Sequence, residues 1–124
     1  WAGLVSRQEC GALMARARAA VLPSVWQETF GLVAVEAMAA GAVPVAAAHG
    51  SFPDLIADGI DGVLFPPGSA SALAEVFCDM DARPERYAQM GQAAYRTYQR
   101  RFTQATNIEQ LLRIYRFAID HPLG

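Results

Sequence analysis

The chain has 124 residues, of which 53% are hydrophobic and 18% are charged, so it has enough apolar side chains for a folded core and is not a disordered segment. Its formal net charge is -2, and it contains no lysine. Because a protein that binds the nucleic-acid backbone needs a basic surface, nucleic acid is not an expected partner.

The spacing of the cysteines and histidines points away from disulfide and metal chemistry. Cys10 and Cys78 lie far apart, so we expect reduced thiols, and His49 and His121 are equally isolated, so no metal site is expected. The most apolar stretch, residues 30–48, is interrupted by a glutamate, a glycine and a proline, which favours a helix followed by a buried strand over a membrane span. No signal-peptide pattern is recognised, and we expect a cytoplasmic protein.

Short apolar runs alternate with helical patterns over the first half of the chain. Ser6 and Glu9 have the spacing of a capping box, which predicts a helix over about 7–18. A run of apolar residues over 19–22, stopped by Pro23, predicts a buried parallel strand. The next predicted segments are a loop over 24–29, a helix over about 30–40 ended by Gly41, a strand over 43–47, a loop over 49–51, a short helix over 53–56 and a strand over 63–65. A proline inside the 43–47 run favours a sheet edge or the first residues of a strand.

Three helices are predicted in the second half of the chain. The first begins at Ser69 or Ser71 and reaches about Met80, and the others cover about 84–101 and 103–119. Strands that alternate with helices predict a Rossmann-like, three-layer α/β fold with a parallel sheet covered on both faces. Because three or four strands make a small sheet, we expect the domain to be incomplete at its N-terminus.

The loop over 23–29 joins a strand to a helix at the edge where open parallel sheets bind their ligands. A helix that begins at Phe30 would turn the free N–H groups of Phe30, Gly31, Leu32 and Val33 toward this edge. With the helix dipole, these groups would form an anion site suited to a phosphate. Because Gly31 has no Cβ, a ligand could approach the backbone closely.

Two glutamates are the candidate polar residues of this edge. Glu36 stands among apolar residues with no basic residue near it in the sequence, and such a carboxylate is costly to bury unless it is hydrogen-bonded. Two ribose hydroxyls would satisfy it, and a solvated head on the helix surface is the alternative that spacing leaves open. Glu28 lies in the loop, where an acid that caps the helix is the alternative to a functional role.

A second candidate wall follows the next strand at the same edge, over residues 49–53. His49 is a candidate acid or base there, with a structural loop histidine as the alternative. Trp26 is a candidate stacking residue, and packing of the loop is its alternative.

The run from Pro23 to Val45, P-S-x-W-x-E-T-F-G-L-V-x-x-E-A-M-A-x-G-x-x-P-V, resembles the C-terminal domain of retaining GT-B glycosyltransferases. That group includes bacterial mannosyltransferases, sucrose synthases and bacterial glycogen synthases, and its hallmark is two glutamates separated by seven residues, here Glu28 and Glu36. Residues 58–68 resemble its D-G-x-x-G-x-L-x-x-P-G segment, and the F-T at 102–103 resembles the start of its closing helix. The resemblance covers nearly the whole chain.

This resemblance implies a role for each residue that matches the family motif. Glu28 would contact the donor sugar and is the candidate catalytic carboxylate, while Glu36 would bind the ribose hydroxyls. Val5 would contact the nucleobase through its main chain. The implied donor-binding residues are Val5, Glu28, Thr29, Phe30, Gly31, Leu32, Val33 and Glu36.

The implied reaction moves a sugar from a nucleoside-diphosphate sugar to an acceptor hydroxyl with retention, without a metal or a further cofactor. Residues 1–103 would be part of the nucleotide-sugar-binding domain, and residues 104–124 its closing helix. The family's diphosphate-binding Arg and Lys have no match here, and they and the N-terminal GT-B domain are expected to precede Trp1. Ser51 and Asp54 depart from the Gly and Glu that relatives often have.

Because half of the cleft would lie in that other domain, we expect the isolated chain to bind donor weakly and to be inactive. Any membrane contact would be made through the absent domain, which would make the longer protein membrane-peripheral. The alternatives are a non-catalytic interaction domain with a GT-B fold, and a GT-B sugar-nucleotide epimerase or phosphorylase. The donor base, donor sugar and acceptor are not specified by this sequence.

Overall fold

The computed structural model describes residues 1–122 and contains the helices and strands expected from residue 7 onward, whereas the expectation that residues 1–3 end a strand is wrong, because they pair with no strand of the sheet. In chain order the elements are α1 (Arg7–Arg16), β1 (Ala19–Leu22), α2 (Leu32–Ala39), β2 (Val43–Ala47), α3 (Phe52–Leu55), β3 (Val63–Phe65), α4 (Ala70–Ala82), α5 (Pro84–Arg101) and α6 (Gln104–Asp120). Their ends differ from the predicted ones by one or two residues, as helix ends commonly do.

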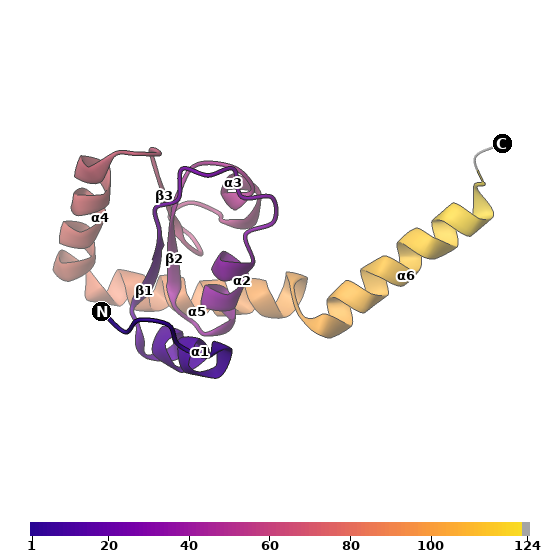
Figure 1. Cartoon of the computed structure of the whole chain (residues 1–124), viewed down its shortest axis with the longest axis horizontal. Helices are drawn as coiled ribbons and strands as arrows, with labels where there is room; N and C mark the ends of the chain where they lie inside the picture. Colours follow the sequence, from indigo (N-terminus) through magenta and orange to yellow (C-terminus); the bar gives the residue numbers. More distant parts are fainter. Residues whose placement is uncertain (123–124) are drawn as a thin grey trace.

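The three strands form a parallel sheet in the order β1-β2-β3 (Figure 1). The register places Val21 beside Val45, and Val45 beside Val63. All three strands end at the same edge, because parallel strands linked by helices run in one direction. The loops that follow β1 and β2 therefore meet there, which confirms the predicted α/β arrangement.

Pro44 lies in the central strand and not at an edge of the sheet. Val43 donates its N–H to Arg18 on the β1 side, so alternation turns the nitrogen of Pro44 toward β3. Pairing with β3 starts one residue later, at Val45. At Pro44 no hydrogen bond between β2 and β3 is needed yet, so the missing N–H of proline costs nothing there. This is why a proline fits near the start of the strand.

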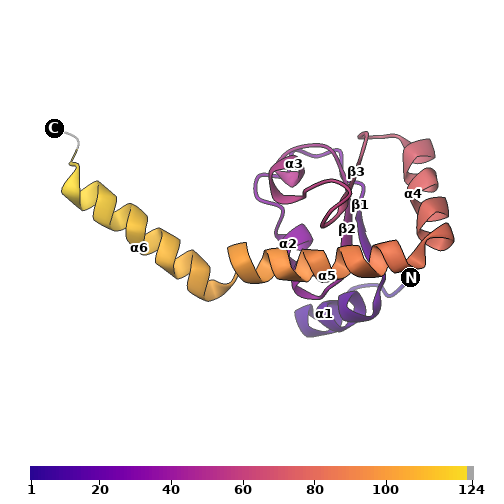
Figure 2. The ribbon, with the colours of Figure 1, turned by 180° about the vertical axis from the view of Figure 1, so that it is seen from behind.

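The side chains of β2 alternate between the two faces of the sheet. Each face therefore carries an apolar cluster, and helices cover both. The cluster on one face consists of Ala34, Val35, Met38, Ala46, Phe52, Leu55, Ile56 and Ala94. The cluster on the other face consists of Val43, Val45, Ala47, Phe65, Met80, Tyr87 and Met90. Helix α5 contributes to both clusters and runs along one end of the sheet (Figures 1 and 2).

The D-G-x-x-G segment before β3 has structural tasks. Asp61 is buried, and its carboxylate accepts the N–H of Ala57 and the hydroxyl of Thr97 on α5, each at 2.8 Å. Asp58 accepts the N–H of Leu64 at 2.8 Å. These two aspartates thus stabilise the turn before β3 and connect it to α5, so neither is a candidate catalytic residue.

Helix α6 extends away from the rest of the molecule (Figures 1 and 2) and contributes no buried residue. Thr103 caps it by accepting the N–H of Thr106 at 3.2 Å. Its large apolar side chains are exposed, namely Ile108, Leu111, Leu112, Ile114, Tyr115, Phe117 and Ile119. The division of the chain into residues 1–103 and 104–124 stays a prediction. Within residues 1–122, no helix has both the length and the apolar character needed to cross a membrane.

Candidate functional site

Helix α2 begins at Leu32, so the prediction that it begins at Phe30 is wrong. Gly31 is the N-cap residue and has the left-handed backbone angles φ 80° and ψ 39°, which interrupt the helix pattern there. Its N–H donates to Oε1 of Glu28 at 3.3 Å. The first helical N–H groups, those of Leu32 and Val33, have no acceptor within the helix and are the candidate anion donors.

The absent Cβ of Gly31 serves the packing of the protein, while a close approach of a ligand to its backbone stays a prediction. A Cβ at this position would lie 2.7 Å from Cδ1 of Leu55, 3.1 Å from Oγ of Ser51 and 3.2 Å from Cε1 of Phe52. The space that a side chain at this position would need is therefore filled by α3 and the residue before it. The close approach fixes the start of α2 against the loop that follows β2.

Glu28 is half-buried, and its loop is anchored on the loop after β2. The N–H of Ser51 donates to the carbonyl of Glu28 at 3.0 Å. A Cβ on Gly50 would lie 2.6 Å from that carbonyl oxygen and 2.8 Å from the Glu28 nitrogen. The structure thus brings the two predicted walls together. It also shows the capping interaction that was the alternative for Glu28, while a catalytic role stays a prediction.

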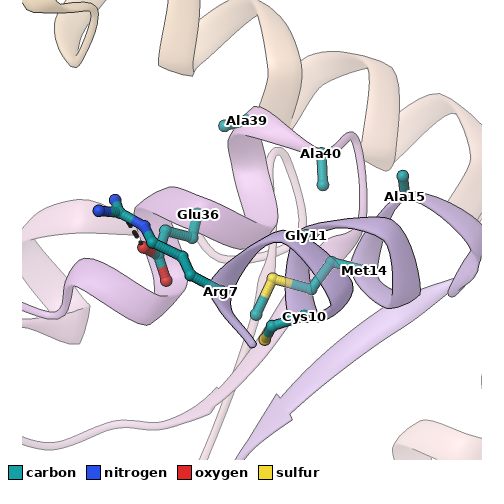
Figure 3. Close-up of a pocket in the computed structure, with 8 residues that line it drawn as sticks. All are labelled: Arg7, Cys10, Gly11, Met14, Ala15, Glu36, Ala39 and Ala40. Atoms are coloured by element: carbon teal, nitrogen blue, oxygen red, sulfur yellow. Dashed lines mark hydrogen bonds and ion pairs between the residues drawn. The ribbon is translucent and has the colours of Figure 1, made fainter. Parts of the chain in front are cut away.

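Glu36 forms an ion pair with Arg7, the first residue of α1, with 3.3 Å between Oε1 and Nη2 (Figure 3). The side chain of Glu36 is 44% exposed and that of Arg7 is 92% exposed. Arg7 lies 29 positions before Glu36 in the sequence, and only the packing of α1 beside α2 brings the two side chains together. The carboxylate thus lies on the helix surface, as the solvated alternative has it, and its binding to ribose hydroxyls stays a prediction.

The ion pair lies at one end of a pocket between α1 and α2 with a volume of about 460 Å³ (Figure 3). Small and sulfur-containing side chains make up the remainder of the lining. The lining residues are Arg7, Cys10, Gly11, Met14, Ala15, Glu36, Ala39 and Ala40. Because Glu36 is one helical turn from Leu32, the carboxylate and the free amides are on neighbouring turns of α2.

The other predicted donor-binding residues include Val5, Thr29 and Phe30. Val5 is half-buried and precedes Arg7 by two positions, and Thr29 is exposed. Phe30 and Leu32 expose their side chains into a second pocket of about 320 Å³ at the start of α2. That pocket also includes Arg101, Phe102, Asn107 and Gln110 at the junction of α5 and α6, together with Val35. The place of Arg7 beside Glu36 was not predictable from the sequence, because Arg7 has no spacing relation to the motif.

The functional roles of His49 and Trp26 stay predictions. His49 is half-buried in the loop after β2, and Trp26 is 79% exposed on the loop after β1. Among residues 1–122, no three histidine, cysteine, aspartate or glutamate side chains are grouped closely enough to hold a metal ion.

Comparison with known proteins shows that this chain is similar to glycosyltransferases. The family model described as "Glycosyl transferases group 1" matches residues 1–97. The D-inositol 3-phosphate glycosyltransferase of Corynebacterium aurimucosum is 38% identical over 113 residues, which cover 91% of this chain and 26% of that protein.

Two solved structures have similar folds. Sucrose-phosphate synthase from Thermosynechococcus elongatus matches with a TM-score of 0.86 at 30% identity, over 95% of this chain and 29% of that one. HepE of Anabaena, solved in complex with UDP, matches with a TM-score of 0.80 at 30% identity, over 83% of this chain and 28% of that one. The chain therefore spans between a quarter and a third of the length of these relatives.

Proposed function

The chain belongs to the group 1 glycosyl transferases and has the α/β fold of GT-B enzymes, and on this premise we propose that it is the nucleotide-sugar-binding part of a glycosyltransferase. The parent enzyme would transfer a sugar from a nucleoside-diphosphate sugar to an acceptor hydroxyl with retention. The remainder of the cleft, including an N-terminal GT-B domain, would be supplied by other parts of that enzyme. The isolated chain would bind donor weakly and turn over none.

The observation that carries this proposal is the start of α2. The free N–H groups of Leu32 and Val33, at the positive end of the helix dipole, are one turn away from the Glu36 carboxylate. Such a pair of features suits a nucleotide, because the amides attract its diphosphate and the carboxylate accepts hydrogen bonds from its ribose. HepE, a relative with the same fold, has been solved with UDP and with UDP-glucose.

The proposed catalysis is electrostatic. As the bond between sugar and diphosphate breaks, negative charge gathers on the leaving diphosphate, and the amides of Leu32 and Val33 would stabilise it. Glu28 uses Oε1 to hold the N–H of Gly31, which leaves Oε2 for a donor-sugar hydroxyl. The amide of Phe30 would face the same sugar, and the main chain of Val5 would contact the base. The scheme needs no metal and no further cofactor.

Replacing Glu36 tests the proposed donor site. In the complete enzyme, we expect Glu36→Ala to weaken donor binding more than tenfold, or by about 1.4 kcal/mol or more, because the ribose hydroxyls lose their acceptor. The measurement is the donor KM together with the dissociation constant of the matching nucleoside diphosphate. Glu109→Ala is the matched control, since Glu109 is an ion-paired, exposed glutamate on α6. An unchanged donor KM in Glu36→Ala would contradict the ribose assignment.

A further inference from the structure

Arg7 is the cation that the structure places beside the carboxylate of Glu36. Its Nη2 atom lies 3.3 Å from Oε1 of Glu36. Only this one oxygen is engaged by Arg7. A carboxylate has acceptor capacity on both oxygens, so Oε2 remains free to accept a hydroxyl while Arg7 stays in place.

The starting point of the Arg7 side chain is fixed by the cap of α1. Ser6 accepts the N–H of Glu9, and Glu9 in turn accepts the Ser6 N–H at 2.8 Å and the Ser6 hydroxyl at 2.7 Å. This reciprocal pair sets the first turn of the helix, in which Arg7 is the first residue. It also occupies the nearest carboxylate on the same helix, so Glu9 does not compete with Glu36 for the guanidinium.

We propose that Arg7 is a positioning residue of the donor site, which holds the Glu36 carboxylate in the orientation that accepts ribose hydroxyls. This inference rests on the proposed function, because it assumes that Glu36 binds the ribose. A half-exposed glutamate loses rotamer freedom when it binds a ligand, and a guanidinium that already restrains it reduces that loss. The ion pair is exposed, so the effect on affinity is modest.

The test compares ribonucleotides with 2′-deoxynucleotides. Dissociation constants are measured in the complete enzyme for UDP, GDP and ADP and for their 2′-deoxy forms, and the tightest pair is followed. We expect Arg7→Ala to weaken binding of the ribonucleotide about two- to fivefold, and to weaken binding of the deoxynucleotide less, because the deoxynucleotide keeps only one of the two hydroxyls. Arg7→Lys should restore at least half of the lost discrimination, because a cation remains beside Glu36.

Two further variants separate this role from others. In a Glu36→Ala background, Arg7→Ala should have no additional effect on ribonucleotide binding, since the group that it positions is gone. Arg18→Ala is the matched control, because Arg18 is an exposed arginine that is paired with Asp81 on α4 at 3.8 Å. It should behave as the unmodified protein.

The other possible results would contradict the proposed role of Arg7. Equal weakening of both nucleotides by Arg7→Ala would overturn the inference and show a general attraction for the diphosphate. Unchanged binding of both would overturn it as well. If Glu36→Ala itself leaves the ribose discrimination intact, or none of the three nucleotides binds, the proposed function fails first and the inference fails with it.

Discussion

Gly31 is the residue on which the start of α2 depends most directly. It combines a left-handed backbone with contacts that leave no room for a side chain. We expect Gly31→Ala to lower the free energy of unfolding by roughly 2–4 kcal/mol, because the new methyl group adds a collision with Leu55 to the cost of the left-handed conformation. Urea unfolding followed by circular dichroism measures this.

Gly41 provides the matched control for that substitution. It has a similar left-handed backbone, with φ 74°, but a Cβ there would meet no atom within 4 Å. Gly41→Ala should therefore cost only the conformational term, about 1 kcal/mol. Equal losses in the two variants would mean that the contacts of Gly31 with Leu55, Ser51 and Phe52 contribute nothing.

The comparison of Glu36 with Glu28 shows how far single residues could be predicted. Both glutamates were recognised from their spacing in the motif, and the capping bond of Glu28 was one of its two predicted alternatives. Arg7 was not recognised, because its relation to Glu36 exists only once two helices pack side by side. Local sequence patterns report hydrogen bonds within a turn, whereas contacts between elements depend on the packing of the whole fold.

At the scale of elements, α1 depends on the cap formed by Ser6 and Glu9. Hydrogen bonds from the Ser6 side chain and backbone lower the pKa of Glu9 below its ordinary value of 4.5. Because the folded pKa is depressed, the stabilisation is fully present above the unfolded value and is lost as the pH falls through the folded value. We expect amide exchange in the first turn of α1 to accelerate as the pH is lowered below 4.5, after correction for intrinsic exchange rates.

Glu9→Gln tests that expectation, since an amide does not ionise in this range. It should remove the acid-dependent part of the change in α1. Glu75→Gln, which replaces an exposed carboxylate in the middle of α4, should leave the pH profile of α1 as it is. A Glu9→Gln profile that still falls with acid would show that another group controls the helix.

The elements themselves were predictable where a local signal sets them. The cap of α1, the serine before α4 and the threonine before α6 each mark a helix start in the sequence. The start of α2 was predicted two residues early, because the apolar run simply continues through Phe30 and Gly31. What stops the helix there is the packing of Gly31 on residues 51–55, which no local pattern records.

At the scale of the whole molecule, α6 is separate from the two apolar clusters. It contributes no buried residue, so deleting residues 104–124 should change the free energy of unfolding by less than about 0.5 kcal/mol. The deletion also removes seven exposed large apolar side chains, so we expect the shortened chain to self-associate less. Urea unfolding and sedimentation velocity measure the two effects.

A longer deletion is the control for this prediction. Removing residues 84–124 also removes α5, which supplies Tyr87, Met90 and Ala94 to the clusters on both faces of the sheet. That chain should fail to unfold cooperatively, since both clusters lose members. If the shorter deletion has the same consequence, α6 stabilises the domain in a way that its exposure conceals.

The contact between Gly50 and the Glu28 backbone ties together two loops that are far apart in the sequence. A side chain at Gly50 would displace the backbone of Glu28. In evolutionary terms, these two loops must change in concert, so a side chain at position 50 is tolerated only with a compensating change in the loop after β1.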